Sequence, residues 1–118
     1  MPDDTETKMV SRTVGNTQIV DEMIFSFTHT VEMAWILPNV PPTGKRVAVP
    51  LVAIIGFEDD KVSFERIYWD QASVLIQIEL LSPKGLPALG VEQTKKVEDP
   101  SLPSNTLIEE SEHGTMMA

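Results

Sequence analysis

Hydrophobic and polar residues alternate over much of the first third of the chain. Residues 8–14 alternate, Gly15-Asn16 supplies a turn, and residues 17–35 continue the extended pattern. Two such runs separated by a Gly-Asn pair are typical of a β-hairpin. In the second run the odd positions form an apolar face and the even positions are mostly polar. The apolar residues are Ile19, Met23, Phe25, Phe27, Val31, Met33 and Trp35, and the polar residues are Glu22, Ser26, Thr28, Thr30 and Glu32. The pattern predicts a long half-buried strand, bent or bulged, that reaches residue 35.

The next segment has the pattern of a second hairpin. Residues 46–57 are rich in Val and Ile, residues 58–61 have the composition of a turn, and residues 62–69 are extended again. Pro50 cannot donate a backbone hydrogen bond, so it favours a sheet edge or a bulge at that point.

The period changes after residue 69. Helical spacing relates Val74, Leu75, Ile78 and Leu81, while Asp70 is a suitable N-cap and Ser82-Pro83 a stop. The sequence therefore predicts a helix over residues 70–81. Its apolar residues cover so much of the circumference that it must be buried in the core or at a dimer interface.

The two ends differ in composition from the centre. We predict a disordered N-terminus over residues 1–8, one ordered domain over residues 9–91, and an acidic, Pro-containing tail over residues 92–118. Four antiparallel strands followed by one helix place the domain in the α+β class.

Charge and composition exclude several classes of function. Against 9 Lys+Arg the chain has 18 Asp+Glu, a net charge of −9, and it contains no Cys. Neither nucleic acid nor an anionic membrane is an expected partner of so acidic a chain. The lack of Cys excludes disulfides and thiolate chemistry, and with only two His we expect no metal site. Neither a signal peptide nor an apolar run of spanning length is visible, so a cytoplasmic location is the default expectation.

Polar groups within apolar strand faces are the first candidates for chemistry. Asp21 and His29 fall on the apolar face of the run 17–35, where a carboxylate and an imidazole could exchange protons with a ligand. The structural alternatives are that Asp21 lies near an open strand end and that His29 is a satisfied core histidine.

The segment 64–71 holds the densest cluster of functional side chains. Alternation places Glu65, Ile67 and Trp69 on one face, and it places Phe64, Arg66, Tyr68 and Asp70 on the other. Either carboxylate could be a general acid or base, with Tyr68 or Trp69 forming an aromatic wall. The structural alternatives are an N-cap role for Asp70 and, for Glu65 and Arg66, pairing with charges on a neighbouring strand of a solvated face.

The motifs Tyr68-Trp69-Asp70-Gln71 and Phe25-Ser26-Phe27-Thr28-His29-Thr30 resemble a known family. The sequence is similar to the SnoaL-like polyketide cyclase branch of the nuclear transport factor two-like superfamily, and the resemblance covers the chain from about Val10 onward. It implies a curved antiparallel sheet that forms a cone-shaped pocket with a C-terminal helix. Such proteins have N-terminal helices that close the pocket, and because this sequence starts almost at the first hairpin we expect those helices to be missing from it.

The resemblance also implies a site and a chemistry. It assigns the acid/base role to Asp70, with Glu65 and His29 assisting, and makes a homodimer and cofactor-free chemistry the expectation. The expected partner is a small hydrophobic molecule, and the candidate substrate contacts are Tyr68, Trp69, Arg66, Phe27 and Trp35.

Three functions stay open at this point. The first is a cofactor-free isomerase or cyclase acting on a polyketide- or terpenoid-like molecule of secondary metabolism. The second is a non-catalytic module of the same fold that binds a ligand or dimerises, favoured by the missing helices and by Phe64 and Arg66 standing where the resemblance leads us to expect histidines. The third is a small lactone or epoxide hydrolase.

Overall fold

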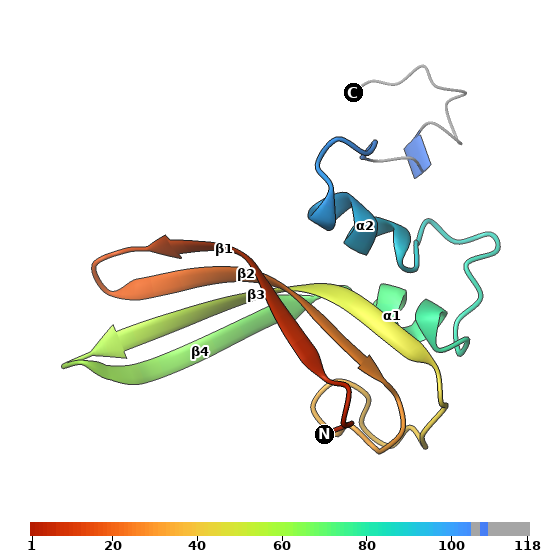
Figure 1. The fold of residues 1–118 in the computed structure, drawn as a ribbon, viewed down its shortest axis with the longest axis horizontal. Helices are drawn as coiled ribbons and strands as arrows, with labels where there is room; N and C mark the ends of the chain where they lie inside the picture. The colour runs from red at the N-terminus through yellow and green to blue at the C-terminus, as the bar shows by residue number, and fades with distance from the viewer. Residues whose placement is uncertain (105–106, 109–118) are drawn as a thin grey trace.

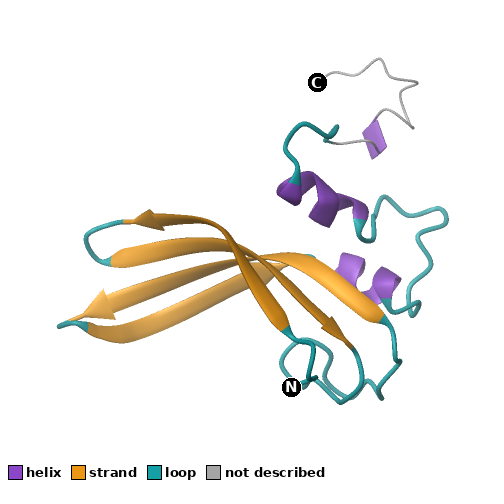
Figure 2. Ribbon diagram, in the orientation of Figure 1, coloured by secondary structure: helices purple, strands orange, loops and turns teal. Residues whose placement is uncertain are grey.

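The structure is a computed structural model that describes residues 1–104, 107 and 108. Its four antiparallel strands form one sheet in the order β1-β2-β3-β4, and two short helices follow (Figures 1 and 2). The elements are β1 (Glu6–Val14), β2 (Gln18–Thr28), β3 (Arg46–Glu58), β4 (Lys61–Trp69), α1 (Gln71–Gln77) and α2 (Glu92–Glu98). The sheet twists strongly, with both hairpin tips at one end and both helices beside the other (Figure 1). The predicted α+β class with a curved antiparallel sheet is confirmed.

The first hairpin forms where the alternation predicts it. The register runs from Glu6 opposite Ser26 to Val14 opposite Ile19, with a bulge after Met9. The predicted disorder of residues 1–8 is wrong, because β1 already begins at Glu6. The residues before β1 are held against the sheet by Asp4. Its carboxylate accepts hydrogen bonds from the backbone amide and the hydroxyl of Thr28 and from the guanidinium of Arg46.

β2 ends at Thr28, seven residues before the predicted end of the strand at Trp35. Beyond it the chain turns, and the backbone amides of Ile36 and Leu37 donate to the carbonyl of Met33. These three side chains are buried at the spacing of one helical turn, whereas Val31 and Trp35 are 42% and 43% exposed. The alternating sequence pattern therefore does not predict the structure after residue 28, because buried and exposed residues no longer alternate there.

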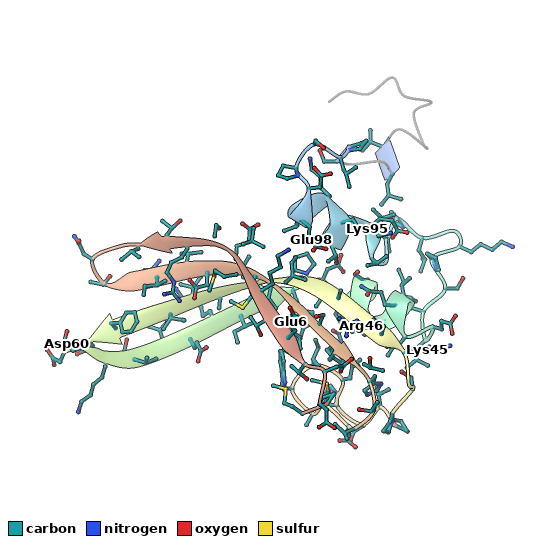
Figure 3. All side chains as sticks on the ribbon, in the orientation of Figure 1. Glu6, Lys45, Arg46, Asp60, Lys95 and Glu98 are labelled. Carbon is teal, nitrogen blue, oxygen red and sulfur yellow. The ribbon has the colours of Figure 1, made fainter. Side chains whose placement is uncertain are left out.

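The second hairpin also forms as predicted. β3 and β4 pair from Leu51 opposite Trp69 to Glu58 opposite Lys61. Asp59 and Asp60 join the strands with positive φ angles of 52° and 64°, the geometry of a tight two-residue hairpin turn. In Figure 3, Asp60 marks this tip, at the opposite end of the sheet from Lys95 in α2.

Pro50 lies within the inner strand β3, at a point where β3 pairs with β2 but no longer with β4. The pairing with β4 stops at Leu51, one residue away. The backbone groups of Ala48 on this side bond instead to the side chain of Gln77, at 2.9 Å for the amide and 3.1 Å for the carbonyl. Residues two apart in a strand point the same way, so Pro50 faces the same free side, where a missing N–H costs no ladder bond. The predicted edge environment is thus local to this end of β3.

α1 begins as predicted and ends early. The Asp70 carboxylate accepts a hydrogen bond of 3.1 Å from the backbone amide of Ser73, which makes it the N-cap. The helix stops at Gln77 because Glu79 adopts a positive φ of 63°. The Leu80 amide then donates to the Leu75 carbonyl and the Glu79 amide to the Ile76 carbonyl, the bonding pattern of a Schellman C-cap. The predicted helix through residue 81 is therefore too long.

Part of the predicted irregular tail is helical. Glu92–Glu98 form α2, which packs against β3 through the fully buried Thr94, whose hydroxyl donates to the Ala48 carbonyl at 2.6 Å. Lys8 of β1 also lies 3.6 Å from Glu98. The anchor is a polar residue in a helix of seven residues, so apolar periodicity could not reveal it. The tail prediction for residues 105–106 and 109–118 lies outside the described residues.

The core fills the space between one face of the sheet, the loop 29–45 and α1. It consists of Phe25, Phe27, Met33, Ile36, Leu37, Val47, Val49, Leu51, Val74 and Ile78. Across the described part of the chain, no helix is both long and apolar enough to cross a membrane.

Candidate functional site

The strand register decides which side chains of β4 face the core. Asp21 pairs with Ala53, which in turn pairs with Ile67. Ile67 therefore shares one face of the sheet, the inner face, with Glu65 and Trp69. The opposite, outer face carries Phe64, Arg66 and Tyr68. The predicted division of this strand into two faces is confirmed, and the inner face reaches the core through Trp69.

Three aromatic rings form a continuous wall at the end of the inner face. The Phe25 and Trp35 ring centroids are 5.2 Å apart, and those of Trp35 and Trp69 are 5.5 Å apart with an angle of 85° between the planes. Such edge-to-face contacts place the positive edge of one ring on the negative face of the next. The early end of β2 makes this possible, because it lets the loop carry Trp35 back to Trp69.

A wide-mouthed cavity of about 470 Å³ opens beside this wall. Its lining consists of Trp35, Ile36 and Pro38 from the loop, Ile67, Tyr68 and Trp69 from β4, and Gln71 from α1. Its volume falls within the range of about 300–1,000 Å³ that is typical of small-molecule sites. The lining is largely apolar, so its chemistry suits a hydrophobic ligand.

Gln71 joins the two sides of this cavity. Its side-chain oxygen accepts a hydrogen bond of 2.6 Å from the indole nitrogen of Trp69. Its side-chain nitrogen donates to the backbone carbonyl of Ile36 at 2.9 Å. Gln71 lies in the Tyr-Trp-Asp-Gln element, but the alternating pattern did not assign it to either face of the strand. Ile36 and Pro38 also line the cavity without having been predicted, and Ile67 was predicted to share a face with Trp69 but not to be a contact.

Asp70 lies between two lining residues without lining the cavity itself. Its carboxylate is exposed, and one oxygen caps α1 by accepting from Ser73. The other oxygen has no hydrogen bond to any described residue. Asp70 therefore has a structural role and, beside the cavity, a carboxylate oxygen that solvent or a ligand can reach.

Neither Glu65 nor Arg66 forms the predicted cross-strand charge pair, because their partners on β3 are Ile55 and Ile54. Glu65 is exposed on the inner face opposite Ile55. Arg66 lies on the outer face, where its guanidinium stacks over the Phe64 ring at 4.3 Å from the centroid. Arg66 is not among the residues that line the cavity, although Tyr68 of the same face is.

His29 and Phe27 are both fully buried. The backbone amide of Thr43 donates to His29 Nδ1 at 3.2 Å, and the Thr43 hydroxyl lies 3.0 Å from the same atom. A neutral ring that accepts at Nδ1 carries its proton on Nε2, and Nε2 is buried without a partner among the described residues. His29 is therefore a core residue, as the structural alternative predicted, but its hydrogen bonds are satisfied at Nδ1 and not at Nε2. Of the five predicted substrate contacts, Trp35, Tyr68 and Trp69 come together at the cavity, and Phe27 and Arg66 do not.

Asp21 is buried on the inner face and paired with β1. Arg12 donates to both of its carboxylate oxygens, at 2.7 Å and 2.9 Å. These hydrogen bonds, with the positive charge of Arg12, lower the pKa of Asp21 below its ordinary value although burial opposes the shift. The group is therefore held as a carboxylate by a fixed partner rather than poised to exchange a proton.

A second cavity, of about 420 Å³, lies between α2 and the residues that follow it, with Leu89, Val97 and Leu107 in its lining. None of the candidate residues lines it. No group of three or more His, Asp or Glu side chains arranged to hold a metal ion occurs in the described part of the chain.

Comparison with known proteins relates the fold to several solved structures. No protein-family model matches the sequence, and no curated protein matches it. The chain is similar to TsrD of Streptomyces laurentii, with a TM-score of 0.59 and 23% identity over 66% of this chain and 55% of that one. It is similar to AclR of Streptomyces galilaeus, described as a candidate hydroxylase, with a TM-score of 0.56 and 24% identity over 67% of this chain and 50% of that one.

A third similar structure is a candidate SnoaL-like polyketide cyclase from Jannaschia sp. CCS1, with a TM-score of 0.57 and 23% identity over 66% of this chain and 51% of that one. The chain therefore has the SnoaL-like fold that the motifs implied. It spans about half the length of the structures it matches.

Proposed function

We propose that this chain binds a small, largely apolar molecule of polyketide- or terpenoid-like chemistry in the cavity between the loop 35–38 and the end of β4. The observation that carries the proposal is the aromatic wall. The indoles of Trp35 and Trp69 pack edge to face and both line a cavity of about 470 Å³. Flat, polarisable surfaces of this kind bind fused or conjugated rings by burying apolar area.

A titration with the neutral fluorophore N-phenyl-1-naphthylamine tests this proposal. A neutral probe is appropriate because the chain carries a net charge of −9, which would repel the usual anionic dyes. We expect saturable binding with a rise in probe fluorescence. Competing apolar ring compounds should displace the probe and reverse this rise.

A matched pair of variants locates the binding. Ile67→Glu places a charge in the apolar lining and should weaken binding by about tenfold or more. Val62→Glu makes the same change on the same strand at an exposed position, 60% accessible, that does not line the cavity, and should bind as the wild type does. Equal binding by both variants, or no binding by the wild type, contradicts the proposal.

A second candidate function is catalysis of an isomerisation or cyclisation in the same cavity, without a cofactor. The observation that favours it is the position of Asp70, an exposed residue that follows the lining residue Trp69 and precedes the lining residue Gln71. In this mechanism Asp70 removes a proton from an acidic carbon of the bound molecule and returns it at another position. Glu65, exposed on the inner face, is the alternative base, whereas the burial of His29 keeps it from direct contact with a ligand.

The base can be tested with 5-nitrobenzisoxazole, whose ring opens once a base removes its carbon-bound proton. Asp70→Asn is the informative variant, because Asn caps a helix as well as Asp does and so preserves the fold. We expect proton abstraction by the wild type above the buffer rate, its loss in Asp70→Asn, and little change in Glu65→Gln. An unchanged rate in Asp70→Asn removes Asp70 from the mechanism, and a loss confined to Glu65→Gln transfers the role to Glu65.

The homodimer implied by the sequence resemblance is also a proposal. Exposed apolar side chains on the outer strands support it, including Val14, Val62 and Tyr68 at 69%, 60% and 57% accessibility. Cover by a second copy would remove this surface from water. Static light scattering should give twice the mass of one chain, and a monomeric mass over a wide concentration range contradicts the expectation.

A further inference from the structure

The two sides of the cavity come from segments that are distant in sequence. Trp35, Ile36 and Pro38 belong to the loop after β2, whereas Trp69 ends β4. Within the described residues, the bond from Gln71 to the Ile36 carbonyl is the one hydrogen bond that joins residues 33–40 to β4 or α1. The distance between the two sides of the cavity therefore depends on this side chain and on apolar packing.

The partners of Gln71 determine how its amide is oriented. The Trp69 indole nitrogen can only donate, so it must meet the amide oxygen. The Ile36 carbonyl can only accept, so it must meet the amide nitrogen. The amide oxygen thus holds the Trp69 side of the cavity and the amide nitrogen holds the Ile36 side. Movement of either side away from the other breaks one of these two hydrogen bonds.

We propose that Gln71 is the positioning residue of the ligand site, which fixes the spacing between the Ile36 backbone and the Trp69 indole and so decides the thickness of the molecule that enters. This inference rests on the proposed function for its ligand, but the geometry it predicts exists in the free protein. A glutamate at this position would still accept from Trp69, but it would place a carboxylate oxygen against the Ile36 carbonyl. Only a neutral amide of this length satisfies both partners.

The same helix provides a matched control. Gln77 also uses its amide to join α1 to a distant segment, through the backbone amide and carbonyl of Ala48. These bonds lie at the start of β3, a third goes to the Ser73 hydroxyl within α1, and Gln77 does not line the cavity. Gln71→Met and Gln77→Met therefore remove equivalent bonding groups with the same change of shape, and only the first acts on the cavity.

Both tryptophans of the chain lie in the cavity wall, so tryptophan emission reports on this site alone. We expect Gln71→Met to raise the acrylamide quenching constant of the free protein by about twofold, because the indole of Trp69 loses its partner and its side of the cavity loosens. The affinity for N-phenyl-1-naphthylamine should fall by about three- to tenfold. Gln77→Met should leave both quantities at their wild-type values while lowering stability.

The outcomes separate the two proposals. Failure of the wild type to bind the probe defeats the proposed function, while the quenching comparison still decides the role of Gln71. The inference is overturned if Gln71→Met has the quenching constant and the probe affinity of the wild type. It is also overturned if Gln77→Met changes both quantities as much as Gln71→Met does, because Gln71 would then have no special part in positioning.

Discussion

The carbonyl of Ala48 provides the sharpest test of how the helices are held to the sheet. It accepts one hydrogen bond from Gln77 of α1 at 3.1 Å and another from Thr94 of α2 at 2.6 Å. The amide of the same residue has a single partner, the Gln77 side-chain oxygen at 2.9 Å. The two helices thus share one acceptor on β3.

The bonds allow the cost of each loss to be calculated. Gln77→Met leaves the Ala48 amide without a partner in a half-buried position, which should cost about 2 kcal/mol. Thr94→Val keeps the volume of a fully buried side chain and removes one hydroxyl, at a cost of about 1 kcal/mol because Gln77 still donates to the carbonyl. The double variant removes both donors and leaves the carbonyl unsatisfied, so we expect its cost to exceed the sum of the single costs by about 1 kcal/mol.

Urea unfolding followed by far-ultraviolet circular dichroism measures all four proteins of this cycle. With a denaturant slope of about 1–1.5 kcal/mol/M for a chain of this size, Gln77→Met should lower the midpoint by about 1–2 M. Additive losses in the double variant, or a loss smaller than the sum, would refute the reasoning, because they would show that the two donors do not share the carbonyl.

Three further changes test other local features of the fold. Asp70→Ala should cost about 1 kcal/mol in urea unfolding because the Ser73 amide loses its cap, whereas Asp70→Asn should cost almost nothing. Gly56→Ala should destabilise by about 1–3 kcal/mol, because the new Cβ would stand 2.0 Å from the Phe64 ring, and adding Phe64→Leu should recover most of this loss in the same assay. Glu79→Gly should melt about 2–4 °C above Glu79→Ala in calorimetry, since both lose the ion pair with Lys45 and glycine adopts the positive φ of 63° without strain, and an equal or lower value would contradict the C-cap described for α1.

Local sequence signals predicted the elements whose structure depends on neighbouring residues. The two hairpins and the N-cap at Asp70 follow from turn composition, alternation and capping preference. The end of α1 could not be predicted in the same way, because the residue at positive φ is Glu79 and not the usual glycine. α2 was missed because its buried anchor, Thr94, is polar.

The candidate site depends on a turn that no local pattern marks. Alternation continues to Trp35, but the chain leaves the sheet after Thr28, and this change brings Trp35 beside Trp69. The sequence placed both rings among the candidate contacts without showing that they meet. His29 and Asp70 also matched the motif, but their roles depend on burial and capping partners that only the folded chain supplies.

The Arg12–Asp21 pair has a consequence for how the sheet opens in acid. β1 is an edge strand in which every residue is exposed, and the buried Asp21 carboxylate attaches it to β2. Because Arg12 lowers the pKa of Asp21 in the folded chain below 3.8, the stabilisation is present at neutral pH and disappears as the pH falls through that lowered value. Acid should therefore detach β1 before it unfolds the rest of the sheet. The protection of β1 amides against hydrogen exchange would then fall at a pH where the amides shared by β2 and β3 are still protected.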